Sequence, residues 1–172
     1  MDEIEGMFMK EVLMNKIVVN MGVGSDPDEM KKAVQIIQLV TGKKPSQTIC
    51  DARIPDWGLR PGIPIGLKVT LRGEQAITFL KKALLAKANR LPEKNFDKSG
   101  NFGFGIKEYI DLPNTKYDPK LGIKGFDVLV SLKKKGYRVK LRKIRANKVG
   151  KKQRVTRTDA IEYVKKLGIE IE

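Results

Sequence analysis

The sequence predicts an α+β fold: a mainly antiparallel sheet packed on one face by two long helices, with a basic C-terminal extension and a final short helix. Three observations support this prediction. Several short segments alternate apolar and polar residues, which is the period of a half-buried strand. Two longer segments carry apolar residues at helical spacing. The loops are too short and too numerous for a doubly wound sheet.

The first predicted strand spans Lys16–Gly24. Ile17, Val19 and Met21 point to one face of the extended chain and Val18 and Asn20 point to the other, so that one face is apolar and the other ends in an amide. Residues 1–15, which precede this strand, are mixed in charge and rich in methionine. We expect this segment to become ordered only against a partner.

The first long helix is expected to follow directly. Asp26 is a suitable N-cap, Pro27 suits the first helical position, and Glu29 completes a capping-box arrangement. Apolar residues then recur at helical spacing over residues 30–40. Gly42 is placed for a left-handed C-terminal cap, which ends the helix.

The other strands follow from period-two alternation. Strands are predicted at residues 46–53, 65–72, 102–110 and 126–132, and a loop is predicted at residues 54–64. The segment 65–72 alternates most clearly, with apolar side chains on one face and basic or polar side chains on the other.

Two further helices are predicted. One begins at Gly73 and ends at Pro92. Its expected apolar stripe consists of Ala76, Ile77, Leu80, Leu84 and Ala88. The final helix begins after Thr156, where Asp159 gives a second capping box, and ends at Gly168.

We divide the chain after residue 132. Residues 1–132 are predicted to form a compact α+β core, and residues 133–172 to form a basic extension and a C-terminal helix that packs on the same domain. The formal net charge is +15, and residues 133–157 contain thirteen basic residues and no acidic one. Such an excess indicates a polyanionic partner. Phosphate contacts made by this segment should be strongly salt-dependent and not sequence-specific.

Composition excludes several classes of site. The chain has one cysteine, Cys50, and no histidine, so we expect no internal disulfide and no metal site. We also expect no cofactor, and an enzyme would lack the side chain most often used for proton transfer near neutral pH. No apolar run is long enough to span a bilayer and the N-terminus is acidic, which predicts a cytoplasmic protein without a membrane partner.

The glycine turn at residues 22–24 has three interpretations. A strand, a glycine turn and a helix form the skeleton of a dinucleotide site, which would suit a nucleotide-using enzyme with Glu108 or Asp111 as a base. Pro27 and its flanking aspartates oppose this, because they put negative charge where a phosphate would lie. The turn is otherwise structural or an RNA contact. Non-specific DNA compaction is a further alternative for so basic a chain.

A polar strand face is one candidate binding feature. Lys68, Thr70 and Arg72 share one face of a strand, and Asn20 and Lys43–Lys44 flank the same predicted sheet. This face is either the solvated side of an antiparallel sheet or a convergence of donors suited to phosphates, ribose hydroxyls and base edges.

A loop with the single tryptophan is the other candidate. Trp57 lies between Arg53 and Arg60 in the segment before residue 64. It either stacks on bases or ribose edges or folds back onto the core as a hydrophobic plug. The sequence leaves these two alternatives open.

Four ordered phrases carry a resemblance to a known family. They read Lys-Ile-Val-Val-Asn-Met-Gly-Val-Gly at residues 16–24, Thr-Gly-Lys-Lys-Pro at 41–45, Pro-Ile-Gly-Leu-Lys-Val-Thr-Leu-Arg-Gly at 64–73 and Asn-Phe-Gly-Phe-Gly-Ile-Lys-Glu at 101–108. Together they closely resemble ribosomal protein five of the large subunit, the family that binds 5S rRNA. The resemblance covers roughly residues 15–132 and the final helix.

The resemblance implies a structural, non-enzymatic role in the cytoplasmic ribosome. It implies that the chain anchors 5S rRNA in the central protuberance and contacts large-subunit rRNA, P-site tRNA, a protein of the small-subunit head and other ribosomal proteins of the central protuberance. The basic extension is absent from bacterial members, which implies the archaeal and eukaryotic branch.

The resemblance also implies site residues. Asn20, Thr70 and Arg72 match family positions that contact 5S rRNA, and Lys43, where bacterial members often carry glutamine, is expected to contact a phosphate. The expected 5S rRNA-binding set is Asn20, Met21, Gly22, Gly24, Lys43, Lys44, Lys68, Thr70 and Arg72. The family extends the loop before residue 64 toward tRNA, and the tRNA-facing candidates are Arg53, Trp57, Gly58 and Arg60. The candidates for rRNA backbone contacts are Lys133, Lys134, Arg138, Arg142, Arg145, Lys151, Lys152 and Arg154.

Overall fold

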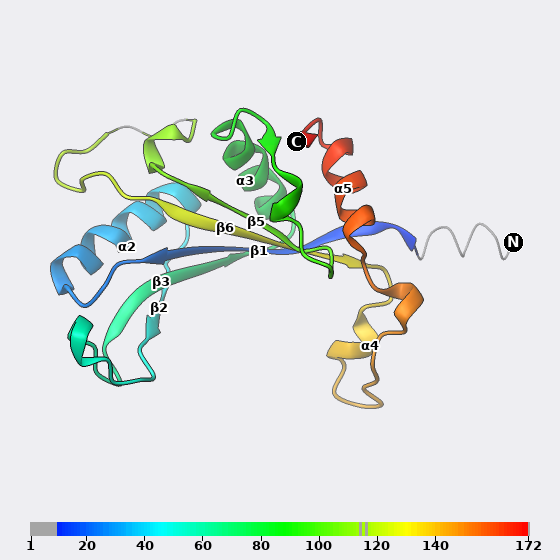
Figure 1. Cartoon of the computed structure of the whole chain (residues 1–172), viewed down its shortest axis with the longest axis horizontal. Helices are drawn as coiled ribbons and strands as arrows, with labels where there is room; N and C mark the ends of the chain where they lie inside the picture. Colours follow the sequence, from blue (N-terminus) through cyan, green and yellow to red (C-terminus); the bar gives the residue numbers. More distant parts are fainter. Residues whose placement is uncertain (1–9, 114, 116, 172) are drawn as a thin grey trace, which may run out of the picture.

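A five-stranded antiparallel sheet forms the centre of the fold (Figure 1). The computed structural model describes residues 10–113, 115 and 117–171. The strand order is β2-β3-β1-β6-β5, and each neighbouring pair is antiparallel. The strands are β1 (Val12–Gly22), β2 (Ser46–Ile49), β3 (Pro64–Leu71), β5 (Phe102–Ile106) and β6 (Phe126–Lys134).

Helices cover one face of this sheet and leave the other face open (Figure 1). The three longer helices are α2 (Pro27–Thr41), α3 (Glu74–Leu85) and α5 (Arg157–Lys166). The short strands β4 (Arg90–Leu91) and β7 (Glu170–Ile171) pair in parallel and tie the end of the chain to the segment after α3. The shortest helices are η1 (Pro55–Trp57), η2 (Glu93–Asn95), η3 (Tyr109–Asp111), α4 (Arg138–Leu141) and η4 (Lys151–Gln153). The predicted α+β class and the mainly antiparallel sheet are confirmed.

The core lies between the sheet and the helices. Along each strand, alternate side chains point toward the helices, which is the expected consequence of the pleat. These strand residues are Ile17, Val19, Met21, Leu67, Val69, Leu71, Phe102, Phe104, Ile106, Phe126, Val128, Val130 and Leu132, and all of them are buried. The helices bury Ala33, Ile36 and Ile37 from α2 and Phe79 and Leu80 from α3 against them. Burial of this one contiguous apolar cluster is the main force that holds the sheet and helices together.

Strand β1 is longer than the sequence predicts. Residues 12–15 were expected to order only against a partner, but they continue β1 and pair with β6, from Val12 opposite Lys134 to Met14 opposite Leu132. A bulge between Met14 and Lys16 adds one residue to β1. The rest of the predicted lead-in, residues 1–9, lies outside the described residues.

Helix α2 begins and ends as predicted, but its capping box does not form. The Asp26 carboxylate accepts a hydrogen bond from the Asp28 N–H at 2.9 Å, and Gly42 ends the helix with φ of +68°. The carboxylate of Glu29 does not reach back to the cap. It forms ion pairs with Lys32 at 2.8 Å and with Lys124 at 2.5 Å, and this second pair ties α2 to the loop before β6.

Helix α3 is shorter than predicted. It ends at Leu85, and Ala88 and Asn89 then take positive φ angles in a turn that leads to β4. Its buried stripe includes Phe79 and Ala83, whereas Ile77 is exposed. The predicted stripe was therefore wrong at Ile77 and Ala88, because the buried face includes Phe79 and Ala83 instead of Ile77 and the helix ends well before Pro92.

The remaining strand boundaries differ by a few residues. β2 ends at Ile49 rather than at residue 53, and β5 ends at Ile106 because η3 follows it. β6 runs to Lys134, so the division after residue 132 falls inside a strand. The capping box of α5 is confirmed, since the Thr156 side chain and the Asp159 carboxylate each accept a hydrogen bond from the other's backbone N–H.

Replacing Gly125 with alanine is expected to lower the free energy of unfolding by about 1–3 kcal/mol. A Cβ atom at this position would lie 2.6 Å from the backbone oxygen of Lys107 and 2.7 Å from that of Ile106, so that the backbone itself would have to move. Urea denaturation measures the change. Gly150→Ala is the control, because no atom lies within 4 Å of the added Cβ there. Equal midpoints for the two variants would contradict this account.

Candidate nucleic-acid interface

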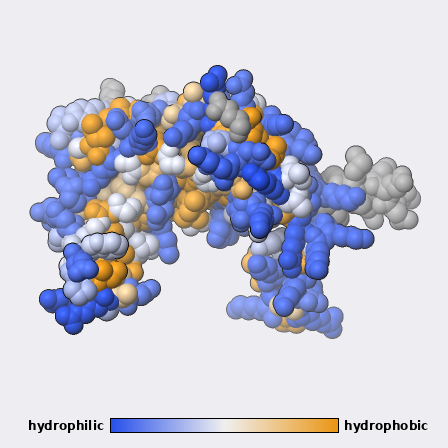
Figure 2. Space-filling view, viewed as in Figure 1, coloured by the Kyte–Doolittle hydropathy of each residue, from blue (hydrophilic) through white to orange (hydrophobic). Residues whose placement is uncertain are grey.

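The open face of the sheet forms the roof of an arch. Two segments project from opposite ends of the sheet on the side away from the helices (Figure 1). We call residues 50–63, between β2 and β3, the first limb, and residues 135–155, between β6 and α5, the second limb. The space-filling view shows the hollow between them, and both limbs are largely hydrophilic (Figure 2).

Strand register lines up the side chains of the open face in rows. One row crosses the sheet from Ser46 through Lys68, Asn20 and Asp127 to Gly105. Asn20 therefore lies directly opposite Lys68, and a carboxylate lies on its other side. This row presents a hydroxyl, an ammonium, a carboxamide and a carboxylate on one surface, which is a set of donors and acceptors suited to base edges and ribose hydroxyls.

The next row contains Thr70, Val18, Leu129 and Gly103. Arg72 follows directly after the last residue of β3 and is exposed. Within the described part of the chain, the side chains of Asn20, Lys68, Thr70 and Arg72 make no hydrogen bond to protein and no ion pair. The structure thus brings four of the predicted residues to one face with their polar groups free.

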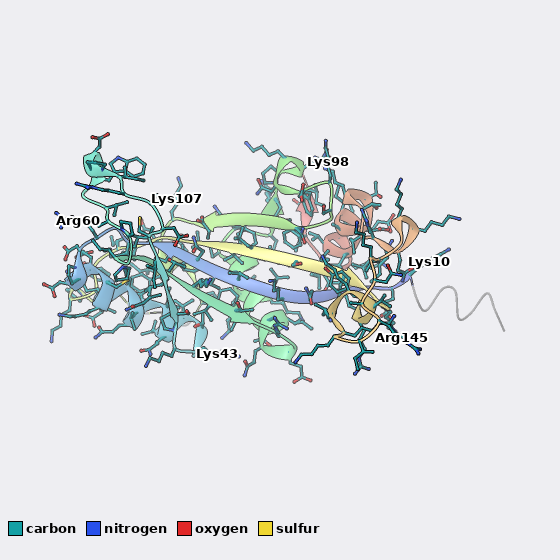
Figure 3. All side chains as sticks on the ribbon, turned by 90° about the horizontal axis from the view of Figure 1, so that it is seen from below. Lys10, Lys43, Arg60, Lys98, Lys107 and Arg145 are labelled. Carbon is teal, nitrogen blue, oxygen red and sulfur yellow. The ribbon has the colours of Figure 1, made fainter. Side chains whose placement is uncertain are left out.

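One predicted residue does not reach that face with its side chain. Met21 is 1% exposed and points into the core, so its side chain cannot contact RNA. Met21 was included from the resemblance, although the alternation along the strand places it on the same apolar face as Ile17. Gly22, the last residue of β1, and Gly24, in the turn after it, are exposed. Lys43 and Lys44 are exposed in the loop before β2, where Lys43 lies at the edge of the sheet (Figure 3).

The glycine turn is not a phosphate-binding loop. The backbone N–H groups of Val23 and Gly24 both donate to the Ile65 carbonyl oxygen at 3.0 Å, so they are not available to a phosphate. At the start of α2 the Asp26 carboxylate occupies the position that an anion would take. The nucleotide-enzyme interpretation is therefore wrong, and the turn serves to join β1 to α2.

The first limb carries an exposed tryptophan. The η1 turn is closed by Gly58, with φ of +64°, and by backbone hydrogen bonds between Ile54 and Leu59 at 3.0 Å. Trp57 at the tip is 71% exposed, so the hydrophobic-plug interpretation is wrong. Arg53 and Arg60 are also exposed, and the limb reaches beyond the end of the sheet near Arg60 (Figure 3).

The second limb carries most of the predicted backbone contacts. The exposed cations that were predicted are Arg138, Arg142, Arg145, Lys151, Lys152 and Arg154. Arg142 Nε donates to the Arg145 carbonyl oxygen at 2.7 Å and Arg154 Nε donates to that of Val149 at 3.3 Å, which shapes the limb without neutralising its charge. Among the residues that the structure describes, these six cations have no acidic partner.

Lys134 is a correction to the predicted set. Its side chain is buried, and Nζ lies 2.6 Å from Asp159 Oδ2, so it serves as a structural group rather than a phosphate contact. Position in the basic run could not show this, because the partner Asp159 lies 25 residues further along the chain. Its neighbour Lys133 is half-buried, pairs with Leu13 of β1 and belongs to the set of alternate β6 residues that face the open side of the sheet.

Asp159 fixes the base of the second limb. Its carboxylate pairs with Lys134 and also accepts the Thr156 N–H at 2.9 Å, which joins β6 to the start of α5. Burial raises the pKa of Asp159, but the hydrogen bonds from Lys134 and Thr156 outweigh it and hold the pKa below its ordinary value. Nearby, Lys135 pairs with Glu11 at 2.6 Å and its carbonyl oxygen accepts Gln153 Nε2 at 2.9 Å.

Acidic side chains are paired on the helical side of the molecule. Asp28 pairs with Lys31, and Glu29 pairs with Lys32 and Lys124. The hydrogen bonds from Lys124 and Lys32 lower the pKa of Glu29 to about 2. Carboxylates of α2 are therefore paired with lysines, whereas the six exposed cations of the second limb named above have no acidic partner within the described residues. Such unpaired cations attract a polyanion.

The described residues hold no cluster of three or more potential metal ligands among histidine, cysteine, aspartate and glutamate. In the same part of the chain, the helices are all too short or too polar to cross a lipid bilayer.

Comparison with known proteins decides the family. The sequence profile for the C-terminus of the ribosomal L5 family matches residues 64–166, and the profile described as "Ribosomal protein L5" matches residues 8–60. The chain belongs to the ribosomal L5 family. The large ribosomal subunit protein uL5 of Pyrobaculum aerophilum is 46% identical over 98% of this chain and 95% of its own length. The uL5 proteins of Archaeoglobus fulgidus and Thermoplasma volcanium are 46% and 42% identical, over 95% and 92% of this chain.

Family membership establishes the general role. This ribosomal L5 protein is a structural, non-enzymatic component of the large ribosomal subunit, and it works in the cytoplasm as part of the ribosome. The predicted family and its archaeal character are confirmed, since the relatives named above are all archaeal.

Sequence analysis did not select Ser46, Lys16 or Asp127 for the interface. All three lie on the open face, Ser46 and Asp127 in the same row as Asn20 and Lys16 opposite Ser131. The alternation along each strand shows which of its two faces each residue occupies. Which residues of neighbouring strands lie side by side depends on the pairing register, which one sequence does not specify.

Replacing Asp159 with alanine is expected to lower the free energy of unfolding by about 1–3 kcal/mol at pH 7, because Lys134 loses its partner and α5 loses part of its cap. The folded-state pKa of Asp159 is lowered, so its contribution is full above the ordinary value of 3.8 and is lost as the pH falls through the lower folded value. Urea denaturation at pH 7 and at acidic pH measures both effects.

Asp51→Ala is the matched control, since Asp51 is exposed and has no ion pair in the described chain. A difference between Asp159→Ala and the control that stays constant down to the acid limit would contradict the assigned role of the carboxylate.

Proposed function

We propose that this ribosomal L5 protein binds 5S rRNA with the open face of its sheet and large-subunit rRNA with its second limb, within the central protuberance. The observation that carries this proposal is the arch itself. An open face with free polar groups lies between two limbs whose exposed cations lack acidic partners within the described part of the chain. The sequence resemblance to the 5S rRNA-binding family supports the choice of RNA.

The open face and the second limb differ in the chemical groups that they offer to RNA. Asn20, Lys68 and Thr70 offer a carboxamide, an ammonium and a hydroxyl side by side, and these groups recognise base edges and 2′-hydroxyls at fixed positions. The cations of the second limb carry charge on flexible side chains, which suits phosphates irrespective of sequence. The open face therefore supplies specificity and the second limb supplies most of the electrostatic affinity.

The first limb is proposed to face P-site tRNA and a protein of the small-subunit head. An exposed tryptophan beside Arg53 and Arg60 can stack on a base or on a ribose edge while the guanidinium groups contact phosphates. The limb projects away from the open face, so these contacts do not compete with 5S rRNA for the same residues (Figure 1).

Replacing Thr70 with alanine is expected to weaken 5S rRNA binding about three- to tenfold at fixed salt, because one hydrogen bond from the open face to the RNA is removed. Filter binding or calorimetry on purified protein measures the dissociation constant. Thr78→Ala is the matched control, since Thr78 is an exposed threonine on α3, on the covered side of the sheet.

The proposal also predicts selectivity. The protein should bind 5S rRNA more tightly than an unrelated RNA of equal length and more tightly than duplex DNA. Equal affinity for all three would contradict the proposal and would favour non-specific nucleic-acid compaction instead.

Changing Arg138, Arg142, Lys151 and Lys152 together to glutamine is expected to flatten the salt dependence of rRNA binding. The slope of log K against log salt should fall by up to roughly 3, at about 0.7–0.9 for each phosphate that is no longer neutralised. Titrations at several salt concentrations measure the slope. In the control variant, four lysines on α3 and α5 are changed to glutamine: Lys81, Lys82, Lys165 and Lys166. This variant alters the net charge equally but leaves the arch intact. An equal reduction of the slope in both variants would show that only net charge matters.

A further inference from the structure

A groove crosses the open face beside strand β5, outside the residues assigned to 5S rRNA above. It has a volume of about 400 Å³ and lies between β6, β5 and the loop 95–101. Lys98, which is exposed, marks this loop in the view of the open face (Figure 3). The groove residues that carry the argument are Lys16, Val18, Asn95, Asp97, Asn101 and Leu129.

The floor of the groove is apolar. Leu129 is 49% exposed in the middle of an otherwise polar face, and Val18 lies beside it in the paired strand. Gly103 stands opposite Leu129 in β5, and a Cβ atom there would lie 2.7 Å from Leu129 Cδ2. The absence of a side chain at Gly103 therefore keeps this part of the face low and leaves room above the backbone of the edge strand.

The wall of the groove carries unused hydrogen-bonding groups. Asn95 and Asn101 are half-buried, and neither carboxamide bonds to protein within the described chain. The loop that holds them is fixed by the Asp97 N–H bond to the Asn101 carbonyl oxygen at 2.8 Å and by the Phe96–Phe102 ring contact at 5.1 Å. The carboxamides of Asn95 and Asn101 are open to solvent in a loop whose position is fixed, so both are available to a ligand with complementary donors and acceptors.

We propose that this groove receives a single unstacked nucleobase of ribosomal RNA. The apolar floor fits the face of a base, and the two amides with the Asp97 carboxylate fit the donors and acceptors along its edge. Lys16, at the β1 side of the groove, fits the phosphate that follows. This inference rests on the proposed function, because the RNA must lie under the open face for a base to reach the groove.

An RNA base fits the groove better than an apolar peptide does. Val18 and Leu129 form the accessible part of the apolar floor, because Phe102 and Val130, which also line the groove, are buried. Lys16 lines the groove as well, and Lys68 lies on the same face of the sheet. The apolar floor can contact one face of a planar heterocycle, while the nearby amide groups bond to its edge.

Chemical probing tests this assignment. Complexes of the full chain with deproteinised 5S rRNA, and separately with deproteinised large-subunit rRNA, are treated with dimethyl sulfate and with a carbodiimide, which modify the pairing edges of unpaired bases. The wild type, Leu129→Ala and Asn101→Ala are compared at saturating protein. Leu85→Ala is the control, since Leu85 is a similarly exposed leucine on α3. Circular dichroism and urea midpoints establish that each variant folds.

In one of the two RNAs, the wild type and Leu85→Ala are expected to protect an unpaired base that regains reactivity in both groove variants. The groove variants should bind that RNA about three- to tenfold more weakly, which corresponds to the removal of one hydrogen bond or one stacking interaction. The RNA that shows this effect identifies the source of the base. Thr70→Ala should leave this base protected.

Identical protection by the wild type and both groove variants in both RNAs would overturn the assignment. If Thr70→Ala still weakened 5S rRNA binding in that case, the proposed function would stand without the groove. If 5S rRNA bound no better than an unrelated RNA, the proposed function would fail for 5S rRNA. Whether the groove binds a base would then be decided by comparing protection of large-subunit rRNA by the wild type and by the two groove variants.

Discussion

The pairing of the central strand β1 with both β3 and β6 is the constraint on which the rest of the structure depends. Because side chains alternate along a strand, this double pairing sends Ile17, Val19 and Met21 into the core and Asn20 to the open face. A slip of one residue would exchange these two sets. The buried set packs against α2 and α3, so the energy of the apolar core fixes the register, and the register fixes which polar groups meet in the row with Lys68.

Charge is organised around the same sheet. On the helical side, Glu29 is paired with Lys32 within α2 and with Lys124, and the second pair joins α2 to the loop before β6. On the other side, the six exposed cations Arg138, Arg142, Arg145, Lys151, Lys152 and Arg154 have no acidic partner in the described chain, and the base of the second limb is anchored by the Lys134–Asp159 and Lys135–Glu11 pairs and by the cap of α5. A limb that is anchored at its base keeps these charges available and loses less entropy in the binding that we propose.

Much of the fold could be predicted from local signals. The Asp26 and Gly42 caps and the Thr156–Asp159 box act within one turn of helix, so the residues nearby are sufficient to specify them. Longer-range features were predicted less well. Residues 12–15 became part of β1 through pairing with β6, and α3 stopped at Leu85 because the chain turns there to form β4 beside β7. The apolar pattern of α3 continued past that point, and nothing local marked the partner strand.

For the interface, the sequence by itself determined the family, the basic character of residues 133–157 and the alternation that places Lys68 and Thr70 on one polar face. These follow from residue identity and spacing. Only the tertiary structure decided that Lys134 is buried, that Trp57 is exposed and that the N–H groups of Val23 and Gly24 are already bonded and so not free for a phosphate. For Lys134 and for the glycine turn the outcome depends on a partner far away in the chain, Asp159 and Ile65 respectively, and spacing along one strand contains no information about such partners.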